Sequence, residues 1–132
     1  MKSEPDAYAW SRLVAEGRGT WDGVRNHQAA NNLRAMRIGE RAFFYHSTQG
    51  KEIVGVMEIA RAGFPDPSDP SGKWVAVEVA PLRPVKRPVT LAAIKADPRL
   101  ADLALVRHSR LSVMPVAPAH WRILCRMAGI AA

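Results

Sequence analysis

The sequence predicts an α+β fold in which a small mixed β-sheet of about five to six strands, curled into a barrel, carries three or four short flanking helices. Segments rich in aromatic and β-branched residues, typical of strands, gather between residues 41 and 80. Short helical patterns with capping residues lie before and after them. Successive strands have no helix of ~10–15 residues between them, which argues against βαβ units.

Two short helices are expected in the first forty residues. Ser11 is a suitable N-cap for a helix over residues 12–16, and Gly17 is a suitable residue to end it. Asn26 is expected to cap a second helix that continues to about Met36.

The strands are expected to be short. They are predicted at residues 41–47, 52–60, 74–80 and 110–116, and a short strand or extended entry is expected before the Glu4-Pro5-Asp6 turn. Within them, Val75, Val77 and Val79 share one face, as in a half-buried strand. Gly55 is a candidate for a bulge or for the close approach of another group.

The remaining segments are expected to be loops and short helices. Residues 64–72 hold three prolines and are predicted to form an exposed loop. Pro81, Pro84 and Pro88 are expected to interrupt regular structure. Thr90 should cap a helix over residues 91–96, and Pro118 should open a final helix whose apolar face includes Trp121, Leu124, Cys125 and Ala128.

Length and composition limit the class of protein. The 132 residues suggest a single domain, and 48% hydrophobic with 23% charged residues is typical of a folded chain. One cysteine excludes an internal disulfide framework and a multi-cysteine zinc site. The sequence shows neither a membrane span nor a signal peptide, so we expect a monomer in the cytoplasm, without membrane contact.

The positive charge is concentrated in one part of the chain. The whole chain has a formal net charge of +7, and residues 1–81 hold ten basic and ten acidic side chains. Residues 82–132 hold nine basic side chains and two acidic ones, Asp97 and Asp102. Such a basic region is the usual electrostatic footprint of a protein that binds nucleic acid, although many small proteins are simply basic.

Motifs of enzymes are largely absent. There is no glycine-rich phosphate loop, and His27, His46, His108 and His120 have no metal-ligand spacing with one another or with Cys125. We therefore predict no metal and no cofactor.

Polar clusters stand at four predicted strand ends or turns. They are residues 2–4, 21–26, 45–47 and 107–112. Polar residues are common at strand ends, but four such clusters in one small sheet suggest a shared ligand site at one mouth of a barrel.

These clusters also resemble a known family. The segments Lys2-Ser3-Glu4-Pro5, Trp21-Asp22-Gly23-Val24-Arg25-Asn26, Phe44-Tyr45-His46-Ser47 and Arg110-Leu111-Ser112-Val113 resemble, in order, the EVE domain family. That family includes the thymocyte nuclear protein type. The resemblance covers about residues 1–125, and it implies a PUA-like fold related to YTH domains.

The resemblance implies a non-catalytic reader of DNA or RNA that accepts a flipped, modified base. Such a pocket needs a flat apolar wall and polar groups for the base edge, for which Trp21 is the first candidate and Tyr45 or Trp10 the second wall. The expected base pocket comprises Lys2, Ser3, Trp21, Gly23, Val24, Asn26, Tyr45, His46, Ser47, Leu111 and Ser112. Arg25, Arg107 and Arg110 are expected to bind phosphates.

Two other functions remain open from the sequence. The chain could be a PUA-like hydrolase or nuclease acting on nucleic acid or modified nucleosides, with Lys2, Glu4 and His46 as candidates for its chemistry. It could also be a module for a small ligand or a protein partner. The sequence does not indicate which base modification would be recognised, nor whether the strand is DNA or RNA.

Overall fold

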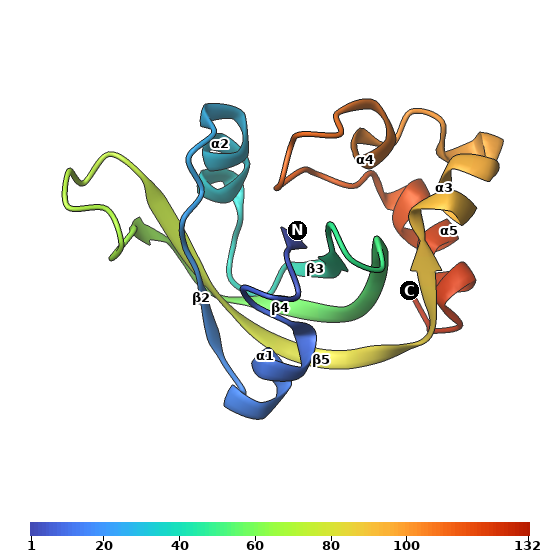
Figure 1. The fold of residues 1–132 in the computed structure, drawn as a ribbon, viewed down its shortest axis with the longest axis horizontal. Helices are drawn as coiled ribbons and strands as arrows, with labels where there is room; N and C mark the ends of the chain where they lie inside the picture. Colours follow the sequence, from blue (N-terminus) through green and yellow to red (C-terminus); the bar gives the residue numbers. More distant parts are fainter.

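A computed structural model describes residues 1–132 and contains a five-stranded sheet in the order β1-β3-β4-β5-β2 (Figure 1). In chain order the elements are β1 (Lys2–Ser3), α1 (Trp10–Glu16), β2 (Gly19–Trp21), α2 (His27–Ala35), β3 (Arg41–His46), β4 (Glu52–Pro65), β5 (Val75–Thr90), α3 (Leu91–Ala96), the 3-10 helix η1 (Pro98–Leu100), α4 (Ala104–Arg107) and α5 (Pro118–Ala128). No helix is both long and apolar enough to span a membrane.

The sheet is mixed and open. β1 runs parallel to β3, while the other neighbouring pairs are antiparallel. The α+β prediction and the number of strands are confirmed, and the sheet stays open rather than closing into a barrel because β1 and β2 do not pair with each other. Figure 1 shows α3, α4 and α5 at one end of the long strands β4 and β5, and the β4–β5 loop at the other.

The two faces of the sheet carry separate hydrophobic cores. Because side chains alternate along a strand, Phe44 joins one core while Phe43 and Tyr45 join the other. The first core includes buried residues of α1 and α2, such as Leu13 and Leu33. The second is covered by α3, η1, α4 and α5.

The cap of α2 was predictable from local sequence, whereas the start of α1 was not. The Asn26 side chain accepts a hydrogen bond from the Ala29 amide at 2.9 Å, which confirms it as the N-cap. Helix α1 begins at Trp10 after Ala9, so the prediction of Ser11 as its cap is wrong. Gly17 ends α1 with a φ of 75°, as expected for a left-handed C-cap.

Gly55 allows the closest aromatic packing in the first core. A Cβ atom at this position would stand 2.5 Å from the ring of Trp10. The β4 register also shifts between Ile53 and Gly55, so both predictions for this glycine are confirmed. The need for a bare backbone here fixes how α1 lies on the sheet.

The three prolines of β5 do not interrupt it, contrary to the prediction. β5 continues to Thr90. Its neighbours in the sheet are β4 and β2, and β2 pairs with Val77–Val79 only. Beyond Ala80, β5 is an edge strand, where proline is tolerated because one side of the backbone needs no donor. The pairing with β4 also shifts register at Pro81 and near Pro84.

Two other predicted boundaries are wrong. Phe64 and Pro65 belong to β4, so the loop begins only at Asp66. Residues 110–116 form no strand. Leu111 and Val113 are buried in alternation, as the pattern indicated, but β1 is too short to provide a ladder and offers one backbone bond, from the Lys2 amide to the Ser112 carbonyl oxygen (2.9 Å).

Candidate functional site

Three cavities meet at β1, and Lys2 lines all of them. We name them after their linings, which are described in turn below: the Trp21 cavity, the Arg110 cavity and the apolar cavity. They divide the residues that the sequence predicted as a single pocket.

The Trp21 cavity has a volume of about 750 Å³ and lies between the two edge strands of the open sheet. β1 supplies Lys2 and Ser3, and β2 supplies Gly19, Thr20 and Trp21. The β1–α1 loop, α1, the flanks of β2 and β5 complete the lining, with Glu4, Ala7, Tyr8, Arg12, Glu16, Arg18, Asp22 and Glu78. The cavity thus brings together β1 and β2, which are separated in the sequence by α1.

Trp21 is mainly a core residue. Its side chain is 7% exposed, and its ring meets those of Tyr8 and Phe44 edge-on at centroid distances of 6.5 and 5.4 Å. Only a small part of the indole is therefore available to a ligand. The proposed second walls lie elsewhere: Trp10 packs on Phe44 and Gly55 in the core, and Tyr45 belongs to the opposite face of the sheet.

Tyr8 also lines the Trp21 cavity, and the sequence reasoning missed it. Its hydroxyl is buried and makes no hydrogen bond of good geometry, with the Glu16 carboxylate as its nearby polar neighbour, so it is a group that a ligand can satisfy. Burial and the neighbouring Glu16 carboxylate raise the pKa of Tyr8. The hydroxyl lies so close to Gly19 that a Cβ atom there would clash with it. The only local signal was the Glu4-Pro5-Asp6 turn, which brings the chain back toward β1.

The charges of the Trp21 cavity are partly neutralised. Arg12 pairs with Glu16 at 3.2 Å, and Arg18 pairs with Glu78 at 2.7 Å. The carboxylates of Glu4 and Asp22 take part in none of the six ion pairs of the structure. These two side chains remain available as hydrogen-bond acceptors.

The Arg110 cavity, of about 590 Å³, has no hydrophobic residue in its lining. It is formed by Lys2, Glu4, Ser47, Thr48, Lys51, Ser109, Arg110 and Ser112. The Lys2 ammonium donates to the Ser109 carbonyl oxygen at 2.9 Å, and burial lowers the pKa of Lys2. This cavity holds three of the predicted site residues besides Lys2.

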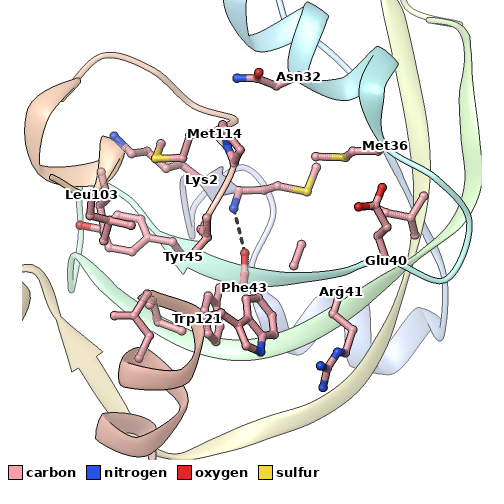
Figure 2. Close-up of a pocket in the computed structure, with 18 of the residues that line it drawn as sticks. Lys2, Asn32, Met36, Glu40, Arg41, Phe43, Tyr45, Leu103, Met114 and Trp121 are labelled. Carbon is pink, nitrogen blue, oxygen red and sulfur yellow. Dashed lines mark hydrogen bonds between the residues drawn. The ribbon is translucent and has the colours of Figure 1, made fainter. Parts of the chain in front are cut away.

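The apolar cavity, of about 260 Å³, lies on the other side of β1, beside β3 (Figure 2). Met36 and Met114 approach it from opposite sides, and Phe43 stacks on Trp121 with 4.0 Å between ring centroids. Fourteen of its nineteen lining residues are hydrophobic. Apart from Lys2, Tyr45 is the only residue of the predicted site that lines this cavity. Burial raises the pKa of Tyr45. The edge of a nucleobase would meet mainly apolar side chains here, although the Nε1 atom of Trp121 is also buried without a hydrogen-bond partner.

Another group of predicted residues is committed to a structural cluster around Asp66. This carboxylate is 1% exposed and accepts hydrogen bonds from the Gly23 amide (2.8 Å), from Arg25 (2.9 Å) and from the amide and hydroxyl of Ser68. Burial acts to raise the pKa of Asp66, but these bonds outweigh it and lower the pKa to about 2. The cluster fastens the 22–26 turn to the β4–β5 loop. Val24 is buried in the core beside it.

The other predicted site residues also have internal partners. Asn26 caps α2, and His46 accepts a hydrogen bond from the Trp10 amide at 3.1 Å. Burial lowers the pKa of His46. Arg107 pairs with Asp102 at 2.7 Å, and Leu111 is buried. None of these four residues lines the three cavities.

Comparisons with known proteins agree with this architecture. Human thymocyte nuclear protein 1 is 36% identical over 150 aligned positions, which cover 88% of this chain and 67% of the human protein. The chain thus spans about two thirds of the length of that relative. The crystal structure of the human protein in complex with DNA containing 5-methylcytosine matches with a TM-score of 0.90 and 32% identity, covering 100% of this chain and 97% of that one.

Two further structures place the fold more widely. The NMR structure of a protein from Rhodopseudomonas palustris is 54% identical, with a TM-score of 0.93 and coverage of 98% of this chain and 90% of the other. The YTH domain of a Zygosaccharomyces rouxii protein, in complex with N6-methyladenosine RNA, is 17% identical with a TM-score of 0.59, covers 100% of this chain and 83% of the other, and shares the fold alone. The family model for the EVE domain matches residues 1–127. The chain therefore belongs to the EVE domain family.

Proposed function

We propose that this protein is a non-catalytic module that binds nucleic acid carrying a modified base and receives that base, flipped out of its stack, in the Trp21 cavity. The observation that carries the proposal is the composition of this cavity, which joins an aromatic floor to uncommitted polar groups at the meeting point of the two sheet edges. Its volume of about 750 Å³ lies within the range of ~300–1,000 Å³ common for ligand pockets.

The relatives support the choice of ligand class. Human thymocyte nuclear protein 1 has been solved with DNA that contains 5-methylcytosine, and a YTH domain with RNA that contains N6-methyladenosine. Both modified bases carry an exocyclic nitrogen that donates a hydrogen bond. Carboxylates are suitable acceptors for such a donor.

The Trp21 cavity offers that chemistry. Glu4 and Asp22 provide acceptors that no cation of the protein occupies. The Ser3 hydroxyl donates to the Tyr8 carbonyl oxygen at 2.6 Å and keeps lone pairs for a base donor. The unpartnered Tyr8 hydroxyl can donate to a ring nitrogen or a carbonyl group of the base. Together these groups can read a base edge, in a lining where polar residues predominate.

The same contacts argue for binding rather than catalysis. A general base needs a free lone pair near its substrate, whereas the Nε2 atom of His46 is occupied by the Trp10 amide. Lys2 is held by the Ser109 carbonyl oxygen. Of the three candidate groups only the Glu4 carboxylate is unpartnered, so no pair of them is free to act together. We therefore favour a binding module over a hydrolase.

Two matched cavity-filling variants test the proposal. Thr20 and Ala35 are both exposed, but Thr20 lines the Trp21 cavity and Ala35 lines the apolar cavity. Thr20→Trp should abolish the preference for a 5-methylcytosine duplex over the unmodified duplex, because the added indole occupies the space of the base. Ala35→Trp should leave that preference unchanged. Fluorescence anisotropy with both duplexes measures the effect, and thermal melting shows that each variant is folded.

The opposite pattern would move the base to the apolar cavity and would refute this assignment. An equal affinity of the unaltered protein for modified and unmodified strands, tested with 5-methylcytosine and N6-methyladenosine in DNA and RNA, would refute the function itself. Turnover of any of these strands would favour the hydrolase.

A further inference from the structure

We propose that the Arg110 cavity is a phosphate subsite, in which Lys51 and Arg110 hold the backbone phosphate next to the flipped nucleotide. This inference rests on the proposed function for the identity of the ligand, but the site is defined by its own residues. Its lining contains no hydrophobic side chain and has three cations, Lys2, Lys51 and Arg110, against the single carboxylate of Glu4. Such a surplus of positive charge suits a phosphate group.

The cations of this cavity are available, unlike most of the arginines first considered for phosphate binding. Lys51 and Arg110 are exposed and take part in none of the six ion pairs. Arg25 is bound to Asp66, and Arg107 is bound to Asp102. Among these four cations, only Lys51 and Arg110 can form a charge-assisted bond without first breaking another.

One wall of the cavity is the β3–β4 hairpin, whose backbone is strained. Thr48 has a φ of 68° and Lys51 a φ of 46°, and they are the only residues other than glycine with positive φ in the structure. Such conformations are uncommon for residues with a Cβ atom and persist where the surrounding structure holds them. The Ser47 amide donates to the Ser3 carbonyl oxygen at 2.9 Å, and the Leu91 amide donates to the Lys51 carbonyl oxygen at 2.8 Å. Both ends of the hairpin are therefore fixed, and Lys51 is presented to the cavity.

The opposite wall is the turn over residues 108–112, and β1 holds it in place. The Leu111 amide donates to the His108 carbonyl oxygen at 3.0 Å. The Lys2 amide and ammonium bind the carbonyl oxygens of Ser112 and Ser109, each at 2.9 Å. Arg110 thus stands between two anchored residues, which limits the entropy that a phosphate contact would cost.

The Arg110 cavity adjoins the Trp21 cavity, because Lys2 and Glu4 line both. A base in one cavity would place its own sugar and phosphate near this shared wall. The two cavities therefore divide a flipped nucleotide by chemistry: its base edge faces acceptors, and its phosphate faces cations. Lys51 is the residue that the sequence did not single out.

The test compares Lys51→Gln and Arg110→Gln with the matched control Arg99→Gln, an exposed arginine that is already paired with Asp97. Affinities for a 5-methylcytosine duplex and its unmodified counterpart are measured over a series of salt concentrations. Each of the two cavity variants should weaken binding of both duplexes about tenfold at low salt and reduce the slope of log affinity against log salt by about one. The control should leave slope and affinity unchanged.

Inorganic phosphate provides an independent measurement. Its titration should shift the NMR amide signals of residues 47–51 and 109–112, and these shifts should disappear in the Lys51→Gln/Arg110→Gln double variant. Salt slopes of the cavity variants equal to that of the control, or phosphate shifts elsewhere in the protein, would overturn the subsite.

The outcome also separates the two proposals. If the cavity variants keep the salt slope of the control while the unaltered protein prefers the modified duplex, the subsite alone is refuted. Flattened slopes without any preference for the modified duplex refute the modified-base function and leave the phosphate site standing. If no duplex binds, the phosphate titration still decides the subsite.

Discussion

Two arginines that the sequence presented as equivalent, Arg25 and Arg110, have opposite surroundings. Arg25 binds Asp66 at 2.9 Å and Ser68 at 3.2 Å, in a cluster that joins two loops. Arg110 stands in a cavity without any carboxylate or hydroxyl bound to its guanidinium. The first arginine stabilises the fold, and the second is free to bind another molecule.

The difference shows that a count of basic residues is not a measure of available charge. Residues 82–132 carry the whole net charge, yet Arg99 and Arg107 in this region are paired with Asp97 and Asp102. Conversely, Lys51 lies in the electrically balanced part of the chain and lines the Arg110 cavity. Only the pairing of each cation distinguishes a structural role from a binding role.

The largest effect that we expect is a loss of stability in the variant Asp66→Ala, which removes the partner of Arg25. The change leaves the Gly23 and Ser68 amides and the Arg25 guanidinium without their buried acceptor. We expect the free energy of unfolding to fall by about 3 kcal/mol, as measured by urea denaturation. Asp69→Ala, in the same loop but with a carboxylate that is only partly buried, should cost clearly less. A similar loss in both variants would contradict the special role of Asp66.

A second expected effect is on the pH dependence of stability. The pKa of Asp66 is lowered from the ordinary 3.8 to about 2 in the folded protein. The ionised carboxylate therefore stabilises the fold fully above about pH 4, and this contribution is lost as the pH falls toward 2. The contribution amounts to about 2 kcal/mol. Asp66→Asn should flatten the acid branch of stability, measured by chemical denaturation between pH 2 and 5. Asp69, whose pKa is also lowered to about 2, keeps part of the dependence in the variant. An unchanged acid branch would show that Asp66 is not a main source of it.

The smallest effect expected concerns Arg25 itself. Its side chain is 41% exposed, so Arg25→Ala should lower the free energy of unfolding by only about 1 kcal/mol. Affinity for nucleic acid should stay unchanged in the folded variant, because this guanidinium is already bound. Anisotropy titrations at a temperature well below the melting point test this. A flattened salt slope would place Arg25 among the phosphate ligands after all and remove the contrast with Arg110.

Local signals explain what the sequence predicted correctly. Asn26 caps a helix through an amide three residues away, and the alternation over residues 41–46 fixes which side chains face each core. The alternating pattern of residues 110–116 wrongly predicted a strand there, because Leu111 and Val113 can be buried without backbone hydrogen bonds to a neighbouring strand.

The site was predicted only in part for a related reason. Lys2, Ser3 and Trp21 meet as expected, while Tyr45 faces the opposite side of the sheet from Trp21. In the Asp66 cluster, Arg25 binds Asp66 and Ser68, which follow it in the sequence by 41 and 43 positions. No local pattern indicates contacts over such a separation. Tyr8 depends on the bare backbone of Gly19, which the sequence shows only as one glycine among nine.

The prolines of β5 have a consequence beyond their own strand. An uncovered strand edge is a template on which other chains can polymerise, and proline is one of the residues that prevent it. From Pro81 to Pro88, three positions of this edge have no amide hydrogen to offer to a foreign strand. A long, valine-rich strand can therefore remain at the border of the sheet while its molecules stay apart in a crowded solution.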